Sequence, residues 1–356
     1  MAHDAASVRP RTGRPPGAQG SKPPPRRDGE RRTYAALDLG TNNCRLLIAR
    51  PQDDGFVIID AFSRIVRLGE GLAASNRLSD AAIERAIAAL TICADKLRRR
   101  HVTLVRSVAT EACRRAENGA DFVRRVHAET GIRLDVIGAG EEARLAVLGC
   151  QALLPQGEGP GLIFDIGGGS TELVLVETLQ GPGADGSVRI LDWFSAPWGV
   201  VSLTEAEGAG LGSNDRDAAA AGYARMKARA ASAFADFATT LPRPTSPPRL
   251  LGTSGTVTTL ASLHLGLASY DRRAVDGLVV PAHDMRAISA RLAGMTISER
   301  AQVPCIGQER ADLVVAGCAI LEAIMDIWPA DRLGVADRGI REGILRSLIA
   351  RDGAGS

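Results

Sequence analysis

The sequence predicts an α/β protein built from two related halves that face a common cleft. First, predicted strands and helices alternate along the chain from Tyr34 onward. Second, both halves begin in the same way. In each half a predicted strand reaches an Asp, which is Asp38 in the first half and Asp165 in the second. The next residue is Leu or Ile, and the Gly after it opens a turn into the following strand. Third, the length of 356 residues is about that of two average domains.

Residues 1–32 differ in composition from the rest of the chain. They hold eight Lys or Arg against three Asp or Glu, a net charge of +5, so the remaining residues carry −3 of the total of +2. The segment is rich in Pro, Gly and Arg and has almost no large apolar side chain, so it cannot bury enough surface to offset its ordering entropy. We therefore predict a disordered basic tail over residues 1–32, and no specific nucleic-acid partner for the acidic body.

Hydropathy and cysteine usage indicate a cytoplasmic protein without a membrane partner. Hydrophobic residues make up 45% of the chain, yet no apolar run reaches the roughly 18 residues of a membrane span. The N-terminus lacks the apolar segment of a secretory signal. The six cysteines form no C-x-x-C pair and no Cys/His ligand pattern, which predicts reduced thiols in the core.

In the first half, patterning predicts three strands with tight connections, followed by alternating helices and strands. The predicted elements are strands over 34–39, 44–50 and 56–62, a helix over 79–100, a strand over 102–110, a helix from Asn118 to about Thr130, a strand over 132–138 and a helix from about Gly140. In the helix over 79–100, apolar residues recur at steps of four and three. Asn118 can cap the next helix, and Gly131 can end it.

The second half repeats this plan. The predicted elements are strands over 161–166, 171–177 and 188–194, a helix over 215–239, a strand, turn and helix start over 250–260, helices near 283–294, 309–328 and 339–351, and a strand over 332–337. The turn-rich segment 180–187 and the Pro-rich segment 241–249 read as surface connections. We place the domains at 33–157 and 158–352, and the last helix is a candidate to pack back on the first domain.

The first turn follows the strand that ends at Asp38. Gly40 permits a turn that few other residues could make, and Thr41 and Asn42 offer donors at its tip. Backbone N–H groups in such a turn can bind an anion. An ordinary hairpin with a polar tip is the alternative.

The second turn contains Gly167, Gly168 and Gly169, followed by Ser170 and Thr171. Glycines weaken a hairpin, so the close approach of a ligand to the backbone would explain them. The flanking carboxylates of Asp165 and Glu172 could hold Mg²⁺, which favours one or two carboxylates together with phosphate oxygens and water. A flexible glycine turn is the alternative.

The third turn, from Gly252 through Thr253 and Ser254 to Gly255, opens a helix. The free N–H groups at such a helix end can bind an anion. Simple N-capping by Ser254 or Thr253 is the alternative. Three turns of this kind in one chain favour phosphoryl chemistry, in which positioning and charge stabilisation dominate catalysis.

Hydrolysis also needs a group that activates water. Glu141 and Glu142 lie in the first turn of a predicted helix, where either could serve as general base or only complement the helix dipole. Arg114 and Arg115 are candidate phosphate ligands because a guanidinium fits phosphate oxygens. None of the five histidines lies in a nucleophile or metal pattern, and the chain has no G-x-x-x-x-G-K-[ST] motif.

Several motifs occur in the order of one family: "ALDLGTNNCRLLIA", "VATEACRRAENGADFVRRV", "GEEARL", "FDIGGGSTELVLV", "WGVVSLTE", "GTSGTVTTLASL" and "DRGIREGIL". They resemble the exopolyphosphatase/guanosine pentaphosphate phosphatase (Ppx/GppA) family of the actin-like ATPase superfamily. The resemblance covers nearly everything from Tyr34 to about Arg351. It implies two actin-like (ribonuclease H-like) lobes around a phosphate-binding cleft, and Mg²⁺-dependent hydrolysis of a terminal phosphoanhydride that releases orthophosphate.

The resemblance also implies roles for individual residues. The catalytic glutamate is Glu142, and the acidic residues associated with the metal are Asp165 and Glu172. The predicted phosphate-binding residues, from the three turns and the resemblance together, are Asp38, Gly40, Thr41, Asn42, Arg45, Arg114, Gly167, Gly168, Gly169, Ser170, Thr171, Gly252, Thr253, Ser254 and Gly255.

The expected activity is an exopolyphosphatase that releases orthophosphate from the end of inorganic polyphosphate with Mg²⁺ as cofactor. A guanosine pentaphosphate (pppGpp) 5′-phosphatase keeps the same fold and changes the substrate. A small-molecule kinase and a non-catalytic nucleotide- or alarmone-binding regulator are further alternatives. Longer members of the family carry an additional, mostly helical HD-like region, and this chain stops soon after "REGIL", so we expect a short two-domain form. The sequence leaves the preferred chain length and a homodimer open.

Overall fold

The computed structural model describes residues 32–52, 55–179, 187–208, 216–240 and 246–354. The chain divides into two units, residues 1–31 and residues 32–356. The tail predicted over residues 1–32 therefore lies outside the described residues, apart from Arg32. Most of the two predicted surface connections, over 180–187 and 241–249, also lies outside them.

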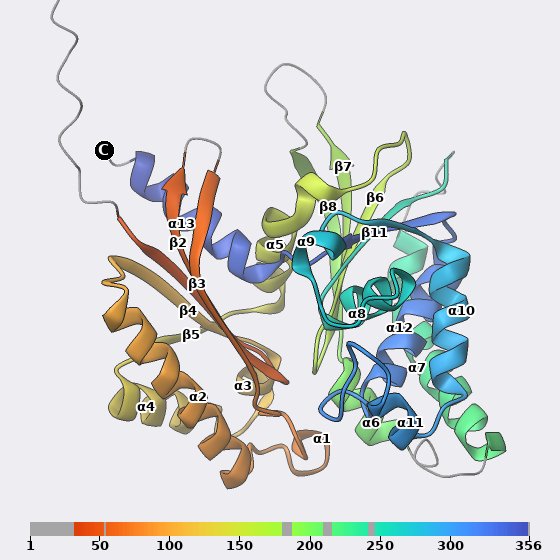
Figure 1. Ribbon diagram of the computed structural model, residues 1–356, viewed down its shortest axis with the longest axis horizontal. Coiled ribbons are helices and arrows are strands. Elements are labelled where there is room, and N and C mark those ends of the chain that lie inside the picture. The colour runs from red at the N-terminus through yellow and green to blue at the C-terminus, as the bar shows by residue number, and fades with distance from the viewer. Residues whose placement is uncertain (1–31, 53–54, 180–186, 209–215, 241–245, 355–356) are drawn as a thin grey trace, which may run out of the picture. The chain divides into compact units, whose positions relative to one another are not determined.

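The described chain forms two β-sheets, each with helices on both faces, and it confirms the predicted two-lobed α/β architecture (Figure 1). The first sheet has the strand order β3-β2-β1-β4-β5. Its strands are β1 (Tyr34–Leu39), β2 (Asn43–Gln52), β3 (Gly55–Ile65), β4 (Leu104–Ala109) and β5 (Leu134–Val136). The helices of this lobe are α1 (Leu72–Ser75), α2 (Asp80–Arg99), α3 (Glu111–Arg115), α4 (Gly119–Thr130) and α5 (Ala139–Cys150).

The second sheet has the order β10-β11-β9-β6-β7-β8. Its strands are β6 (Gly161–Ile166), β7 (Thr171–Thr178), β8 (Val188–Ala196), β9 (Arg249–Thr253), β10 (Val279–Pro281) and β11 (Arg332–Ala336). The helices that follow α5 are the 3-10 turn η1 (Gln151–Leu153), α6 (Val200–Glu207), α7 (Arg216–Thr240), α8 (Gly255–His264), α9 (Arg272–Val275), α10 (Ala282–Ala293), α11 (Ile297–Ala301), α12 (Val314–Ile327) and α13 (Ile340–Ala354).

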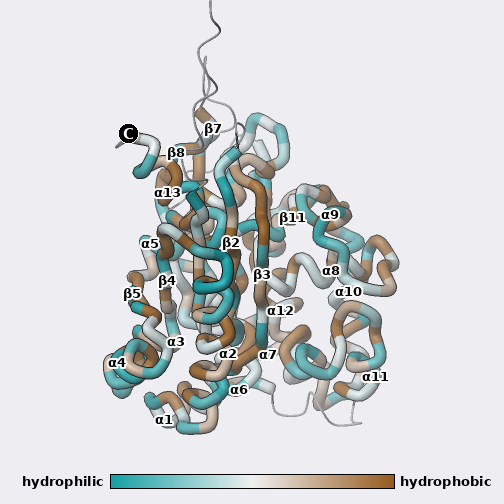
Figure 2. Tube along the Cα trace, turned by 60° about the vertical axis from the view of Figure 1, so that its left-hand side comes forward, coloured by the Kyte–Doolittle hydropathy of each residue, from teal (hydrophilic) through white to brown (hydrophobic). Residues whose placement is uncertain are grey.

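The period-two alternation along β1 and β2 places two cores on opposite faces of the first sheet. Leu37 and Leu46 belong to the core that α2 and α4 complete. Ala36 and Leu47, one residue along each strand, belong to the core that α5 and α13 complete. The edge strand β3 keeps an apolar stretch, visible in Figure 2, in which Val57 is 47% exposed.

Two helices connect the lobes. α5 packs on β7 and β8 of the second sheet, and α13, the last helix, packs on α5 and β1. A Cβ atom on Gly149 of α5 would lie 1.9 Å from the carbonyl oxygen of Gly339, and one on Gly343 of α13 would lie 2.0 Å from the carbonyl oxygen of Leu145. Glycines at these places therefore allow the two backbones to approach closely.

Several predicted elements differ in extent from the observed ones. The strand predicted over 132–138 is reduced to Leu134–Val136, and the helix predicted over 309–328 begins only at Val314. The predicted capping role of Asn118 is wrong, because its side chain makes no capping bond. Its Oδ1 accepts from the backbone amide of Leu78 at 2.9 Å, and its Nδ2 donates to the carbonyl oxygen of the same residue at 3.0 Å. The side chain of Asn118 therefore bonds a segment distant in the sequence instead of the start of its own helix. Gly131 ends the helix with φ of 74°, as expected.

Candidate active site

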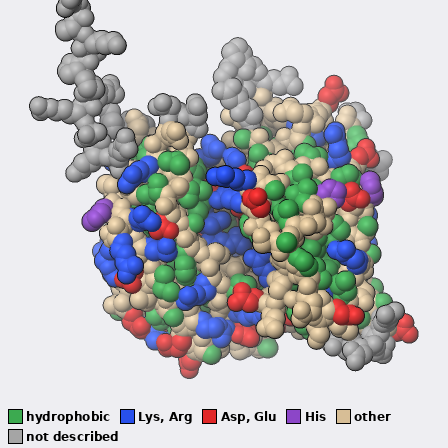
Figure 3. All heavy atoms as spheres, in the orientation of Figure 1, with side chains coloured by type: hydrophobic (Ala, Val, Ile, Leu, Met, Phe, Trp, Pro, Cys, Tyr) green, Lys and Arg blue, Asp and Glu red, His purple; other side chains and the backbone are tan. Residues whose placement is uncertain are grey.

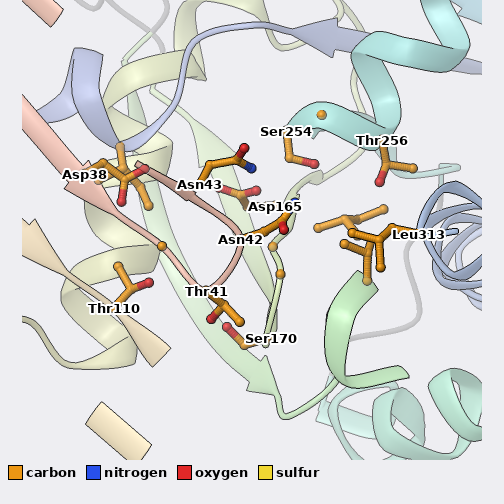
Figure 4. A pocket seen from close by; sticks show the side chains of 18 of the residues that line it. Asp38, Thr41, Asn42, Asn43, Thr110, Asp165, Ser170, Ser254, Thr256 and Leu313 are labelled. Carbon is orange, nitrogen blue, oxygen red and sulfur yellow. The ribbon is translucent and has the colours of Figure 1, made fainter. Parts of the chain in front are cut away.

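A pocket between the two lobes collects residues from all three predicted turns. It encloses about 930 Å³ of empty space, part of it open to solvent. The predicted site residues that line it are Asp38, Gly40, Thr41, Asn42, Arg45, Glu142, Asp165, Gly167, Gly168, Gly169, Ser170, Glu172, Ser254 and Gly255. Figure 4 shows labelled side chains from both lobes around the same space.

The first two turns are the same hairpin built twice. Asp38 pairs with Arg45 across β1 and β2, and Asp165 pairs with Glu172 across β6 and β7. In each hairpin the amide at the first glycine closes the turn, from Gly40 to the carbonyl oxygen of Asn43 at 2.9 Å and from Gly167 to that of Ser170 at 3.0 Å. The weak internal repeat read from the sequence is thus a repeat of structure. We call residues 40–42 loop I and residues 167–170 loop II.

The tips of the two loops present unused backbone donors. The amides of Thr41, Asn42, Gly168 and Gly169 donate no hydrogen bond to any residue that the structure describes. Carbonyl oxygens of the same loops already accept hydrogen bonds from other segments. The backbone amides of Val66 and Gly69 donate to loop I, and those of Val200 and Val201 donate to loop II. Amides held in this way, with their carbonyl groups occupied elsewhere, form an anion-binding concavity.

The glycines are needed for a reason that differs from the predicted one. Gly40 is not among the described residues with positive φ, and a Cβ atom there would meet nothing closer than 3.7 Å, so the expectation of a turn special to glycine is wrong. In loop II, by contrast, a Cβ atom on Gly168 would lie 3.0 Å from the amide nitrogen of Asn42. A Cβ atom on Gly169 would lie 2.7 Å from Thr41 Oγ1. Gly168 and Gly169 therefore let the two loops touch.

The third turn is strained at Ser254. This residue has φ of 94°, which is rare for a residue with a side chain, and its Oγ is buried without a partner among the described residues. It makes no capping hydrogen bond to α8, so the capping alternative for Ser254 is wrong. Buried orphan atoms also occur in the same pocket at Asp38 Oδ1 and Asn42 Oδ1. Unpaired polar atoms gathered around one cavity indicate a site that binds a polar ligand or water.

Four carboxylates line the same pocket, those of Asp38, Glu142, Asp165 and Glu172. Burial raises the pKa of Asp165 to about 6, and burial together with the Asp165 carboxylate raises the pKa of Glu172 to about 7. Burial also raises the pKa of Asp38, against the opposing effect of Arg45. Burial, and then the Glu172 carboxylate, raise the pKa of Glu142 well above its usual value. Acids whose pKa values are displaced in this way are typical of catalytic clefts.

The structure separates the two candidate glutamates. Glu142 is 6% exposed and lines the pocket. Glu141 points elsewhere and pairs with Arg106 at 2.9 Å. Arg114 stands behind Glu142 and does not line the pocket. Its guanidinium donates to Glu142 Oε2 at 3.2 Å, to Glu111 Oε2 at 2.5 Å and to the carbonyl oxygen of Ile137 at 2.7 Å.

Three other predicted phosphate ligands lie outside the pocket lining. Thr171 is fully buried, and its hydroxyl donates to the carbonyl oxygen of Trp198 at 2.7 Å. The hydroxyl of Thr253 donates to the carbonyl oxygen of Arg338 at 2.8 Å. Gly252 packs under the ring of Phe164, which a Cβ atom would meet at 2.7 Å. These contacts explain the residue types without a ligand.

Several lining residues were missed by sequence reasoning. They are Thr110, Ile166, Val200, Thr259, Arg310, Leu313, Val314 and Ile340. The most consequential is Arg310, which no motif singles out and which the sequence placed inside a helix. Burial lowers its pKa and the nearby Arg45 guanidinium lowers it further, so two cations face one cavity. Figure 3 shows Lys and Arg side chains gathered along the hollow between the lobes.

The donor set fits a hard divalent cation of the kind predicted. Asp165 and Glu172 face each other across a strand pair, and Glu172 accepts hydrogen bonds from Ser170 and from the Ser195 hydroxyl, the latter at 2.9 Å. Burial is the main cause of the raised pKa values of these carboxylates, and a bound cation would favour their ionised forms. The described residues contain no group of three or more His, Cys, Asp or Glu placed to hold a metal ion. Mg²⁺ does not require one, because it keeps waters and substrate oxygens as ligands.

Two touching hairpins with free amides, two arginines and four carboxylates around one pocket define a phosphate-binding α/β protein of the actin-like class. Residues 47–352 match the model of the Ppx/GppA phosphatase family, and the chain belongs to this family. It is therefore a phosphatase, that is, a hydrolase.

Sequence and structural similarity to known proteins supports this assignment. Exopolyphosphatase 2 of Mycobacterium tuberculosis is 33% identical over 332 residues, which cover 88% of this chain and 98% of that protein. The crystal structure of the Aquifex aeolicus Ppx/GppA family member has a TM-score of 0.71 at 29% identity, over 90% of this chain and 98% of that one. An exopolyphosphatase from Cytophaga hutchinsonii reaches a TM-score of 0.78 at 23% identity, over 90% and 98%, and shows the fold alone.

These likenesses confirm the actin-like, two-lobed fold class and the predicted family. The described residues include no helix that is both long enough and apolar enough to cross a membrane.

Proposed function

We propose that the protein is an exopolyphosphatase that hydrolyses the terminal phosphoanhydride of inorganic polyphosphate and releases orthophosphate. The observation that carries this proposal is the set of unused amides at Thr41, Asn42, Gly168 and Gly169, which belong to residues lining a pocket that two arginines also line. Polyphosphate is a chain of anionic oxygens without a base or sugar. The site supplies many donors for such a chain.

The substrate lies with its terminal phosphate between loops I and II and with the following phosphates toward Arg45 and Arg310. Backbone amides in this position hold the non-bridging oxygens and stabilise the charge that develops on them during transfer. Glu142 lines the same pocket, where it orients a water for in-line attack and accepts its proton. Arg114, bonded to Glu142, is a positioning residue that holds this carboxylate in place.

Asp165 and Glu172 would hold Mg²⁺ beside the terminal phosphate. The ion supplies charge neutralisation of the phosphate oxygens. The raised pKa values of Asp165 and Glu172 in the metal-free protein fit this role, because a cation would favour their ionised forms. Thr171, Gly252 and Thr253 are not expected to touch phosphate, since the residue types there are explained by other contacts.

Glu142→Gln tests the assignment of the base. The substitution keeps the shape of the side chain and removes its ability to accept a proton, so the turnover number should fall by about 10²–10⁴. Glu141→Gln on the same helix is the matched control, because Glu141 pairs with Arg106 outside the pocket, and it should leave turnover nearly unchanged. Phosphate release from long-chain polyphosphate measures both. A Glu142→Gln protein that folds normally and turns over like wild type would rule out this mechanism.

The pKa of Glu142 predicts a pH profile. Because a base acts in its ionised form and the pKa of Glu142 is raised, kcat/KM should increase as pH rises and should fall in acid at a higher pH than an ordinary glutamate would give. Mutation of Arg114 to Gln removes a cation that opposes this rise. The acid limb of the profile should then move to higher pH, as measured by initial rates.

A pppGpp 5′-phosphatase is the second candidate, and one observation favours it. The pocket wall includes the apolar side chains of Leu313 and Val314, which a polyphosphate chain does not need and a nucleoside could contact. Phosphate release measured with polyphosphate, pppGpp and ATP, with and without Mg²⁺, compares the candidates directly. A kinase would need ATP and an acceptor, and a regulator would bind without hydrolysis. A homodimer and the cytoplasmic location remain predictions.

A further inference from the structure

A second, smaller cavity lies directly behind the two loops. It is lined by Thr41, Gly69, Leu72, Ala73, Glu111, Arg115, Gly169, Val201, Ser202 and Glu205. Thr41 and Gly169 line this cavity and the active-site pocket as well. The wall between the two spaces is therefore a single layer, formed where one residue of loop I touches one residue of loop II.

The wall is a contact between the lobes and not a continuous piece of chain. Thr41 belongs to the first lobe and Gly169 to the second, and no hydrogen bond joins them among the described residues. Behind the wall, α1 packs against α6, and the amide of Gly71 donates to Glu205 Oε1 at 2.8 Å. Both residues are exposed, so this bond competes with water and holds the lobes together only weakly.

Helix α6 connects this outer contact to the wall. Its first amides, at Val200 and Val201, donate to the carbonyl oxygens of Gly167 and Gly168 at 3.0 and 2.8 Å. The hydroxyl of Ser202 donates to the carbonyl oxygen of Gly169 at 3.0 Å. Glu205 lies one turn further along the same helix. A movement of α6 away from α1 would therefore carry loop II with it and separate Gly169 from Thr41.

The chemistry of the proposed reaction makes such an opening useful. Attack of water on the terminal phosphorus forms one P–O bond and breaks the bridging one, which leaves orthophosphate between the loops and the shortened polymer on the open side. The remaining chain then blocks the way the substrate came in. Orthophosphate leaves either after the polymer has dissociated or through the wall behind it.

We propose that the cavity behind loops I and II is an exit for orthophosphate, opened by separation of α1 from α6. This inference rests on the proposed polyphosphatase function. Arg115 lines the cavity, is exposed and has no carboxylate within 4.0 Å among the residues that the structure describes, so its guanidinium is available to a passing anion. Glu111 and Glu205 line the same cavity and disfavour a tightly held anion, which suits a passage better than a binding site.

Blocking the cavity tests the exit. Ala73 and Ala74 are exposed neighbours on α1, and only Ala73 lines the cavity. Ala73→Trp should fill it, and Ala74→Trp is the matched control. Chemical-quench measurements report bond cleavage, and a fluorescent phosphate-binding protein reports orthophosphate free in solution. Both are recorded for one turnover of polyphosphate.

In the Ala73→Trp protein the rate of cleavage should stay at the wild-type value, and the delay between cleavage and free orthophosphate should lengthen about tenfold, a release barrier higher by about 1.4 kcal/mol. The control should match wild type. An unchanged delay, or slowed cleavage, would overturn the proposal. Failure of the proposed function would look different, because no cleavage of polyphosphate would then be seen in any protein.

A second pair of variants covers the case in which the tryptophan disturbs folding. Glu205→Ala removes the acceptor for the Gly71 amide, and Glu205→Gln keeps an oxygen acceptor at the same place. If orthophosphate leaves through this cavity, the delay between cleavage and free orthophosphate should be shorter in Glu205→Ala than in wild type. In Glu205→Gln the delay should be close to that of wild type. Equal delays in wild type and Glu205→Ala would overturn the role of the α1–α6 contact.

Discussion

The two hairpins at the pocket share a geometry and differ in charge. In the first, the strand that leaves the turn places Arg45 opposite Asp38, and in the second the equivalent position holds Glu172 opposite Asp165. Both turns close with the same backbone bond and present free amides at their tips. One backbone design therefore serves two electrostatic tasks. The first hairpin adds a cation to the amides, and the second adds a pair of acids.

Because of this difference in charge, we expect the two hairpins to have different roles in the site. In the proposed function, Arg45 attracts the anionic chain and Glu172 helps to hold the metal. The Glu172 carboxylate also raises the pKa of Glu142. If the two hairpins were equivalent, the same substitution at the two positions would have the same consequence. The following predictions compare them, from the largest expected effect to the smallest.

Glu172→Gln should have the largest effect. Loss of one of the two carboxylates proposed to hold Mg²⁺ should lower kcat by at least about 10²-fold and raise the Mg²⁺ concentration needed for half-maximal activity. A Mg²⁺-dependent gain in thermal stability, expected for wild type at pH 8, should also weaken, because an ion that binds only the folded state stabilises it. A variant with an unchanged Mg²⁺ requirement in both measurements would contradict the assignment.

Arg45→Leu should affect binding more than turnover. A charge-assisted hydrogen bond to a substrate oxygen contributes about 1.5–3 kcal/mol, so KM for polyphosphate should rise by about 10- to 100-fold with a smaller change in kcat. The Mg²⁺ requirement should stay near that of wild type. Arg45→Lys keeps the charge and should recover part of the loss. Steady-state kinetics at several Mg²⁺ concentrations would reveal a shared role of the two hairpins if Arg45→Leu also shifted the metal requirement.

The acid pair should make the metal-free protein less stable as pH rises. The folded-state pKa values of Asp165 and Glu172, about 6 and about 7, lie above their ordinary values of 3.8 and 4.5. Between about pH 4 and pH 7 the folded state therefore keeps protons that the unfolded state has lost, and the free energy of unfolding falls as pH rises. Urea unfolding in chelator at pH 5 and pH 8 measures this slope.

Glu172→Gln is the control for that slope. Without the Glu172 carboxylate, the loss of stability between pH 5 and pH 8 should be smaller than in wild type by more than about 1 kcal/mol, since one unit of pKa shift corresponds to about 1.4 kcal/mol. An identical slope in the two proteins would mean that Glu172 is not the buried acid responsible. Arg45→Leu should not flatten the slope, because it removes a cation from beside Asp165 and Asp38.

The smallest effect is expected from a methyl group on the first hairpin. A Cβ atom on Gly40 would meet nothing closer than 3.7 Å, so Gly40→Ala should change the free energy of unfolding by less than about 0.5 kcal/mol. The same change at Gly168 places a Cβ atom 3.0 Å from Thr41 Cβ and from the amide of Asn42. It should cost about 1–3 kcal/mol through overpacking. Equal stabilities in chemical denaturation would show that the loops can separate freely.

Much of the candidate site was readable because its residues lie in short, local patterns. The hairpins around Asp38 and Asp165 were found from a repeated strand, carboxylate and glycine, and they do meet at one pocket. Thr253 and Gly252 belong to an equally suggestive pattern, yet their surroundings use them for a hydrogen bond and for packing under Phe164. A pattern identifies which residue types stand together along the chain. It does not tell which way each side chain points.

The sequence by itself determined the longer strands and helices, the repeated hairpins and the family, because periodicity, turn residues and motifs are properties of neighbouring residues. Short elements such as α1, α3 and α6 carry too little periodic signal and were not predicted. Only the tertiary structure decided that Glu142 faces the pocket while Glu141 pairs with Arg106, that Arg310 joins Arg45, and that Thr41 and Gly169 form a thin wall between two cavities. These relations join residues far apart in the chain, and they depend on how the two lobes pack. Packing of that kind leaves no periodic signal along the sequence.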